Sequence, residues 1–222
     1  MKIMTSKSGP EAIGLSDKAL LAEVSDYYTQ KLSTHGETPK GVDWNGAEGQ
    51  VLRFTQLCRL IQLQTFSIAD LGCGYGAMFD YLRTSYDDFS YIGVDIADAM
   101  IDAAKKRYAH QDAARFITAN RPDEVADYAV ASGIFNVRLG RSDSEWKAYL
   151  VDTLDVLASS SRYGFAFNCL TSYSDAPFMR SDLYYADPCW LFDLCKRRYS
   201  KNVTLLHDYD LYEFTILVRK SS

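Results

Sequence analysis

The sequence predicts a three-layer α/β domain with a doubly wound, seven-stranded sheet, an antiparallel last strand and an N-terminal helical cap. From residue 67 onward, short apolar segments alternate with helical patterns, which is typical of parallel strands whose helices cover both faces of the sheet. Only about five residues join the last two apolar segments, which is too few for a parallel crossover. The last strand must therefore run antiparallel to its neighbour.

Two helices are expected before the sheet. Residues 20–32 carry apolar side chains at helical spacing, and a loop over residues 33–44 follows. Asn45 is the expected N-cap of the second helix, with Glu48 as its capping-box partner. The buried stripe of this helix is expected to comprise Val51, Phe54, Cys58 and Ile61.

The core elements follow from the same periodicities. Strands are expected over residues 67–71, 91–96, 114–119, 128–132, 164–170, 203–207 and 213–219. Helices are expected over residues 77–83, 146–157 and 191–199, and Asp98 is the expected cap of one more. Ser142 and Glu145 form a capping box at the start of the helix over 146–157. A chain of 222 residues fits one domain, with residues 1–65 as its tail and cap and residues 66–222 as its core.

Composition excludes several classes of partner. The 24 basic and 29 acidic residues give a net charge of −5, so no basic surface for nucleic acid is expected. No apolar segment approaches the roughly 18 residues that span a bilayer, and the N-terminus lacks an apolar signal core, so no membrane partner is expected. The five scattered cysteines form no CxxC pair, which favours a cytoplasmic location and no metal site. The oligomeric state stays open.

The strongest motif is the segment Asp70-Leu71-Gly72-Cys73-Gly74-Tyr75-Gly76, in which a strand leads through glycines into a helix. Such a turn lets a ligand approach the backbone at the helix N-terminus, at the carboxyl edge where open α/β sheets bind ligands. Asp95 ends the second strand, where its carboxylate can accept hydrogen bonds from both hydroxyls of a ribose. Together these features fit an adenosine-containing cofactor.

The spacing of the glycines distinguishes between cofactors. Dinucleotide sites use G-x-G-x-x-G, whereas here the glycines are evenly spaced and follow an acid. The segment resembles the first motif of class I S-adenosylmethionine (SAM)-dependent methyltransferases, of the type that acts on small molecules. The similarity extends over roughly residues 50–219 and includes the antiparallel last strand. A purely structural turn is the alternative interpretation.

The resemblance implies SAM as the cofactor and S-adenosylhomocysteine (SAH) as the product. Asp70 would hold the amino group of SAM, and Asp95 would hold its ribose. Asn120 stands where the family usually has an Asp that accepts from the adenine, and Arg53 matches an arginine that binds the SAM carboxylate in several members, unless it is a solvated helix residue. The implied cofactor site comprises Arg53, Asp70, Gly72, Cys73, Gly74, Gly76, Asp95, Ile96, Met100, Asn120, Ser132, Gly133 and Ile134.

Methyl transfer from SAM depends mainly on aligning the acceptor, and an oxygen or nitrogen acceptor also benefits from a nearby base. His207 beside Asp208 is the best candidate, because histidine accepts a proton near neutral pH. The alternative is that His207 merely ends a strand. Asn136 follows the fourth strand and is expected either to orient the acceptor or to cap its own loop.

The acceptor is expected at the loops that follow the fourth, fifth and sixth strands. These loops carry several of the 16 Tyr and 11 Phe residues, and tyrosine offers apolar area with a polar tip to a polar organic molecule. The expected acceptor site comprises Tyr28, Trp44, Asn168, Tyr173, Phe178, Tyr184, Tyr185 and Tyr212. Tyr28 and Trp44 are alternatively core residues of the cap.

The predicted function is therefore SAM-dependent methylation, at oxygen or nitrogen, of a sugar, polyketide, amino-acid derivative or other small metabolite. Enzymes that methylate nucleic-acid bases carry an Asn/Asp-Pro-Pro-aromatic motif after the fourth strand, where this chain has Ser132-Gly133-Ile134-Phe135. Two alternatives stay open. One is a catalytically silent binding protein with the methyltransferase fold, and the other is a nucleotide-linked oxidoreductase.

Overall fold

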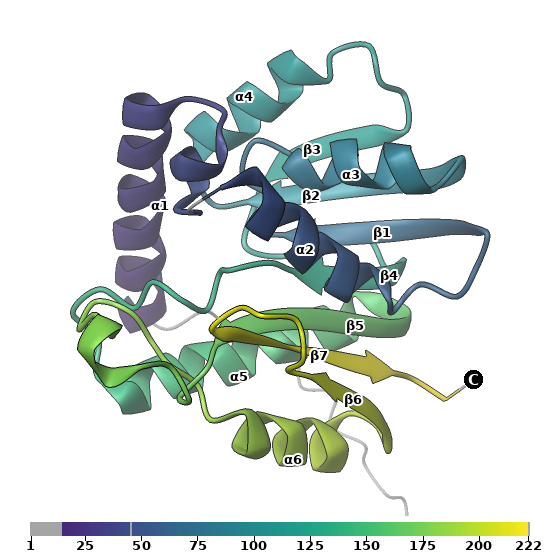
Figure 1. Cartoon of the computed structure of the whole chain (residues 1–222). Coiled ribbons are helices and arrows are strands. Elements are labelled where there is room, and N and C mark those ends of the chain that lie inside the picture. The colour runs from purple at the N-terminus through teal and green to yellow at the C-terminus, as the bar shows by residue number, and fades with distance from the viewer. Residues whose placement is uncertain (1–14, 45, 222) are drawn as a thin grey trace, which may run out of the picture.

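The computed structural model describes residues 15–44 and 46–221, which form one seven-stranded sheet in the order β3-β2-β1-β4-β5-β7-β6 (Figure 1). The strands are β1 (Thr65–Leu71), β2 (Asp88–Asp95), β3 (Ala114–Thr118), β4 (Ala126–Ala131), β5 (Ser161–Leu170), β6 (Asn202–Leu206) and β7 (Glu213–Arg219). Strand β7 is antiparallel to both β5 and β6, while the other pairs are parallel. The predicted doubly wound sheet with an antiparallel last strand is confirmed.

Helices cover both faces of this sheet and bury a separate hydrophobic cluster on each. They are α1 (Leu15–His35), α2 (Ala47–Cys58), α3 (Ala77–Ser85), α4 (Asp98–Arg107), α5 (Asp143–Ser159) and α6 (Pro188–Arg198), with short 3-10 turns η1 (Pro39–Val42) and η2 (Ala176–Phe178). Side chains of α2, α3 and α4 join one cluster, and side chains of α1, α5 and α6 join the other. The result is the expected three-layer arrangement.

The N-terminal helix α1 compensates for a missing crossover helix. Strand β3 is connected to β4 by residues 119–125 alone, and no helix lies in this connection. Leu20 and Val24 of α1 instead pack into the cluster that contains Ile92 and Val94 of β2. The cap is therefore part of the core, which places its following segment at the carboxyl edge of the sheet (Figure 1).

Several local expectations are corrected. Asn45 lies outside the described residues, and α2 has Gly46 as its N-cap with no side-chain cap hydrogen bond. Ala97, rather than Asp98, is the N-cap of α4, because its carbonyl accepts the first helical hydrogen bonds. Val51 is 48% exposed because α2 turns Phe54 and its neighbours toward the sheet instead.

Other local predictions are confirmed. The capping box of Ser142 and Glu145 is present, with both reciprocal hydrogen bonds. Strands β1 and β2 begin two and three residues before their predicted starts, because the polar residues Thr65, Asp88 and Ser90 interrupt the apolar pattern there. No helix between residues 15 and 221 is long and apolar enough to cross a membrane.

Candidate functional site

The glycine turn after β1 has a conformation that only glycine adopts easily. Gly72 and Gly74 have φ values of 79° and 54°, in the left-handed region. A Cβ atom on Gly72 would lie 2.1 Å from Cγ2 of Ile134, and one on Gly74 would lie 2.9 Å from Cγ1 of Val42. Both the backbone and the lack of space therefore require glycine, and the turn lies in contact with the loop after β4 and with the cap.

Asp95 holds this turn against the end of β2. Its Oδ2 accepts a hydrogen bond from the Gly74 amide at 2.9 Å, and its Oδ1 accepts one from the Ala97 amide, also at 2.9 Å. Burial raises the pKa of this carboxyl group, while the two amides oppose the shift. Asp95 thus fixes the turn and the start of α4 together, and each carboxylate oxygen retains acceptor capacity.

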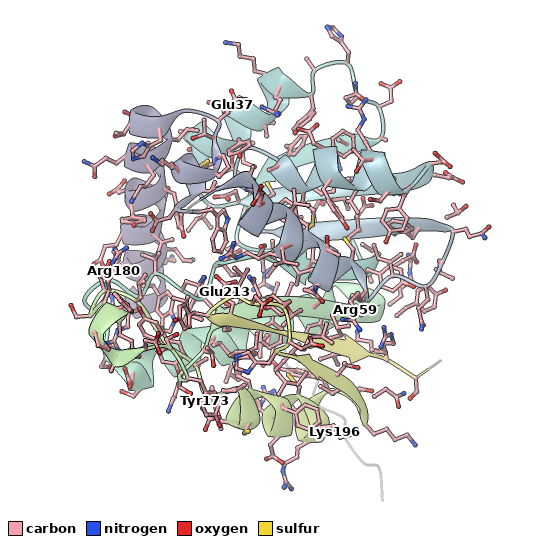
Figure 2. All side chains as sticks on the ribbon, viewed as in Figure 1. Glu37, Arg59, Tyr173, Arg180, Lys196 and Glu213 are labelled. Atoms are coloured by element: carbon pink, nitrogen blue, oxygen red, sulfur yellow. The ribbon has the colours of Figure 1, made fainter. Side chains whose placement is uncertain are left out.

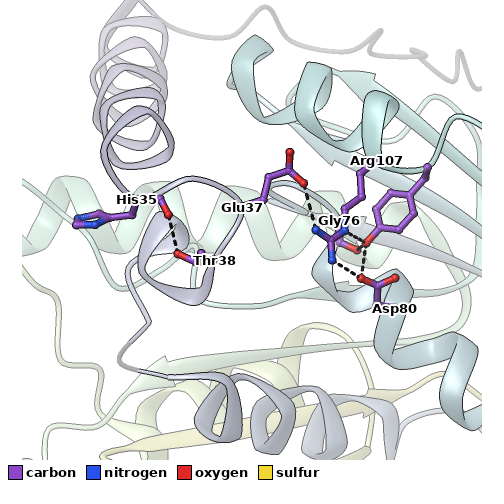
Figure 3. Close-up of polar contacts among 7 residues, drawn as sticks. His35, Glu37, Thr38, Gly76, Asp80 and Arg107 are labelled. Atoms are coloured by element: carbon purple, nitrogen blue, oxygen red, sulfur yellow. Dashed lines mark hydrogen bonds and ion pairs between the residues drawn. The ribbon is translucent and has the colours of Figure 1, made fainter.

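A polar network also ties the far end of the turn to the cap (Figure 3). Arg107 at the end of α4 pairs with Glu37 in the cap at 3.1 Å and with Asp80 of α3 at 2.8 Å. The Tyr108 hydroxyl donates to the Gly76 carbonyl at 2.9 Å. Because exposed ion pairs contribute little stability, this network mainly sets the position of the cap relative to the turn.

Asp70 is a buried carboxylate with an unused oxygen. Its Oδ2 accepts a hydrogen bond of 2.6 Å from the Tyr91 hydroxyl, whereas its Oδ1 has no partner among the described residues. Burial raises the pKa of Asp70 to about 7. The buried Oγ of Ser132 likewise has no partner among these residues. Because buried polar atoms are normally hydrogen-bonded, two such atoms facing one cavity indicate a polar ligand.

That cavity, of about 390 Å³, lies at the carboxyl edge of the sheet. Its volume is within the range of small-molecule sites, roughly 300–1,000 Å³. Most of the predicted site residues line it, namely Tyr28, Trp44, Arg53, Asp70, Gly72, Cys73, Gly74, Met100, Ser132, Gly133, Ile134, Asn136, Phe178, Tyr185 and Tyr212. The structure therefore brings residues from the cap, the glycine turn and three later loops to one place.

The N-terminal cap closes one side of this cavity. Asp43 has a φ of 63° and is held by the Tyr27 hydroxyl at 2.7 Å and by Lys31 Nζ at 2.6 Å. This clamp places the next residue, Trp44, against the loop after β4, where a Cβ on Gly133 would lie 2.3 Å from the indole ring. Residues of α1 thus determine where the cavity wall lies.

A closed ring of contacts, which we call the ion-pair ring, connects Trp44, Arg53, Glu213, Asn168 and Gly133. Arg53 donates through Nε and Nη2 to the two carboxylate oxygens of Glu213, at 2.8 and 2.7 Å, and its guanidinium carbon lies 3.9 Å from the centre of the Trp44 ring. Asn168 donates to Glu213 at 2.7 Å and accepts from the Gly133 amide at 2.8 Å. The ring joins α2, β5, β7 and the loop after β4.

Sequence reasoning missed Glu213, which lies at the start of β7 in the middle of the molecule (Figure 2). Its side chain is only 2% exposed and lines the cavity. A single acid at the start of an otherwise apolar strand was the available signal. Three further charged lining residues, Asp43, Asp175 and Arg180, are not among the predicted site residues, because they lie in connections without a motif; Asp175 and Arg180 belong to the loop after β5 that was expected to reach the acceptor.

Several predicted site residues do not line the cavity. Gly76, Asp95, Ile96 and Asn120 are not among its lining residues, although Asp95 accepts a hydrogen bond from Gly74 of the lining, and Asn168 is connected to the lining through the ion-pair ring. Tyr184 is only 4% exposed and belongs to the core, whereas Tyr173 is 68% exposed.

His207 and Asp208 are exposed and also lie outside the cavity lining. The imidazole of His207 has its ring centre 6.0 Å from that of Tyr173 and 5.9 Å from that of Phe214. The reason is the strand order: His207 follows β6, and β6 is the edge strand of the sheet. A residue after this strand lies at the side of the site, so the base role of His207 stays a prediction.

Comparisons with known proteins identify the family. Residues 68–159 match the family model described as a methyltransferase domain. The curated protein named Putative methyltransferase Rv1506c, from Mycobacterium tuberculosis, is 64% identical over 157 residues, which cover 71% of this chain and 95% of that protein. The chain belongs to the methyltransferase family. This methyltransferase is an enzyme, as predicted, and the oxidoreductase alternative is set aside.

Solved structures share the fold of this methyltransferase at low sequence identity. The DhpI-SAM-HEP complex has a TM-score of 0.63 and 13% identity, with 89% of this chain and 96% of that chain covered. N-methyltransferase NodS from Bradyrhizobium japonicum WM9, in complex with SAH, has a TM-score of 0.60 and 16% identity, with 89% and 98% covered. Both matches cover nearly the whole of the solved chain, so the two proteins share the complete fold with this chain.

The ion-pair ring predicts a specific pattern of stability changes. Arg53→Met should lower the free energy of unfolding by about 3–5 kcal/mol, because it leaves the Glu213 carboxylate buried without its cation. Adding Glu213→Gln removes that buried charge, so the double variant should regain part of the loss. Urea unfolding of the single and double variants measures the coupling.

The matched control is Arg197→Ala, which breaks the exposed pair of Arg197 and Asp193 at 2.7 Å. It should leave the unfolding midpoint unchanged, since exposed pairs contribute little. A loss in Arg53→Met no larger than in this control would contradict the energetic role of the ring.

The raised pKa of Asp70 predicts that the free energy of unfolding depends on pH in the parent protein and less so in Asp70→Asn. Its pKa in the folded protein is about 7, against an ordinary value of 3.8, so between these values the folded state holds a proton that the unfolded chain has released. The free energy of unfolding therefore falls as the pH rises toward 7, and Asp70→Asn removes this fall. Between about pH 5 and pH 8 the variant should gain roughly 2–3 kcal/mol over the parent.

Urea unfolding of the cofactor-free protein at the two pH values measures this gain. Asp26→Asn, on the exposed side of α1, is the control and should show no pH-dependent gain. A constant difference between the Asp70→Asn variant and the parent across this pH range would show that Asp70 does not titrate there.

Proposed function

We propose that this methyltransferase transfers a methyl group to an oxygen or nitrogen atom of a small or medium organic acceptor, such as a sugar, a polyketide or an amino-acid derivative. Its cofactor is SAM and its product is SAH. The observation that carries the proposal is the single cavity that joins the glycine turn to a mouth lined by Phe178, Tyr185 and Tyr212. One cavity of this kind can hold a donor and an acceptor in contact, which is the main requirement of the reaction.

The methionine half of SAM fits the polar atoms beside the glycine turn. Asp70 Oδ1 and Ser132 Oγ have no partner among the described residues, and the SAM amino group can donate to both. Arg53 uses two of its five N–H groups for Glu213, so its remaining donors can serve the SAM carboxylate. These residues would hold the zwitterionic end of the cofactor.

The adenosine half fits the other side of the turn. Each oxygen of Asp95 accepts one backbone hydrogen bond and keeps capacity for a ribose hydroxyl. Met100 is buried and lines the cavity, so it offers an apolar contact to the adenine. Asn120 follows β3 and can accept from the adenine amino group through its amide oxygen.

The acceptor half combines aromatic walls with a fixed amide. Asn136 is buried and lines the cavity, and its Oδ1 accepts from the Leu170 amide at 3.0 Å, which fixes its orientation. Its NH₂ group can then hold an acceptor atom in line with the methyl group. The aromatic rings exclude water from that atom, and this alignment supplies most of the rate enhancement that the reaction requires.

Asp95→Ala should weaken SAM binding by about 1–3 kcal/mol, because the ribose hydroxyls lose their acceptors. Isothermal titration of the purified chain with SAM and with SAH measures the loss. Asp98→Ala is the control, because Asp98 is exposed at the start of α4 and should leave both affinities unchanged. Equal affinities in Asp95→Ala and the parent would refute the ribose assignment.

Transfer of radiolabel from methyl-labelled SAM tests the acceptor class. The enzyme is incubated with a low-molecular-mass metabolite fraction, with a protein fraction and with a nucleic-acid fraction. We expect label to enter the metabolite fraction and to be lost in the Asp95→Ala variant. Label confined to protein or nucleic acid, or SAM binding without transfer to any fraction, would overturn the proposed function.

A further inference from the structure

Most of the charged groups that line the cavity are neutralised by ion pairs within the protein. Arg180 donates through Nε and Nη2 to both oxygens of Asp182, at 3.0 and 2.5 Å. Asp43 is paired with Lys31 at 2.6 Å. Arg53 and Glu213 of the ion-pair ring likewise neutralise each other. None of these groups offers an acceptor a net charge, and the fork of Arg180 that would bind a carboxylate is already filled.

Asp175 differs from these paired groups. Its Oδ2 accepts a hydrogen bond from the Tyr212 hydroxyl, which carries no charge. In the part of the chain that the structure describes, Asp175 forms no ion pair with a lysine, arginine or histidine. Its carboxylate therefore presents an uncompensated negative charge at the mouth of the cavity.

Aromatic rings surround the same part of the mouth. Phe178 is 76% exposed and Tyr212 is 53% exposed, and both line the cavity although no residue that the structure describes covers them. The hydroxyl of Tyr185, a third lining ring, accepts from the Arg180 amide at 3.0 Å, which fixes that ring in place. Phe178, Arg180 and Tyr185 all belong to the loop between β5 and α6, on which Figure 2 labels Arg180. Aromatic faces attract cations, so the rings and the carboxylate favour the same kind of ligand.

We propose that Asp175, with Tyr212 and Phe178, binds a cationic amino group of the acceptor at the mouth of the cavity. This inference rests on the proposed function, since it names the chemical class of its substrate. The amine-bearing acceptor forms a charge-assisted hydrogen bond to Asp175 and packs its carbon skeleton on the aromatic rings. The atom that receives the methyl group lies further in, toward Asn136. A neutral or anionic acceptor of the same shape would lack the first interaction.

Three probes of one shape and different charge test this recognition: 2-phenylethylamine, 2-phenylethanol and phenylacetate. An alkyl amine is protonated at neutral pH, as a lysine side chain is. Each probe is titrated into the SAH-loaded enzyme, and ligand-detected NMR measures its dissociation constant. The amine should bind at least about tenfold more tightly than the alcohol, in keeping with a hydrogen bond to a charged group. Phenylacetate should bind most weakly.

Asp175→Asn should abolish the preference, so that the amine and the alcohol bind with similar affinity. Asp210→Asn is the matched control, because Asp210 is an exposed acid on the neighbouring hairpin and does not line the cavity. It should retain the tenfold preference. The control therefore separates a local contact from the general negative charge of the surface.

Titration with SAH alone precedes these measurements and should give equal affinities for the parent and both variants. If the parent protein does not bind SAH, the proposed function is refuted rather than the amine site. With SAH bound, three results would overturn the amine site: no binding of the amine, equal binding of all three probes, or an amine preference that persists in Asp175→Asn.

Discussion

A buried ion pair between Arg53 and Glu213 connects parts of the chain that are 160 residues apart. Removing two charges from water is costly, so such a pair is stable only when hydrogen bonds and stacking satisfy it fully. Asn168 and Trp44 supply those contacts here. Through them the pair positions the Gly133 loop and the cap together. The pair therefore links several of the elements that form the cavity wall.

Asp70 shows the opposite arrangement, in which a buried polar atom has no partner among the described residues. Burial raises the pKa of Asp70, and this shift reflects the free energy needed to keep the carboxylate charged there. A buried polar atom without a partner normally destabilises a fold. An enzyme tolerates it where the missing partner is supplied by its ligand, which is a common trade of stability for function. The ion-pair ring thus contributes satisfied polar groups to the cavity wall, whereas Asp70 contributes an oxygen without a partner among the described residues.

The cap takes part in both the hydrophobic core and the cavity wall. Helix α1 packs Leu20 and Val24 into the core on the face where the connection from β3 to β4 contains no helix. The same helix clamps Asp43 through Tyr27 and Lys31, and so helps to position the cavity wall that Trp44 forms. Folding and site formation are therefore coupled, because the helix that completes the core also completes the cavity.

The sequence by itself determined the features that depend on local order. The strand-to-helix alternation, the antiparallel last strand and the glycine turn with Asp70 and Asp95 all follow from residues close together in the chain. Only the tertiary structure decided that Glu213 pairs with Arg53, and that β6 lies at the edge of the sheet and leaves His207 outside the cavity lining. The physical reason is that periodicity and turn chemistry act over a few residues. Pairing between distant side chains depends instead on strand order and on which buried charges must be satisfied.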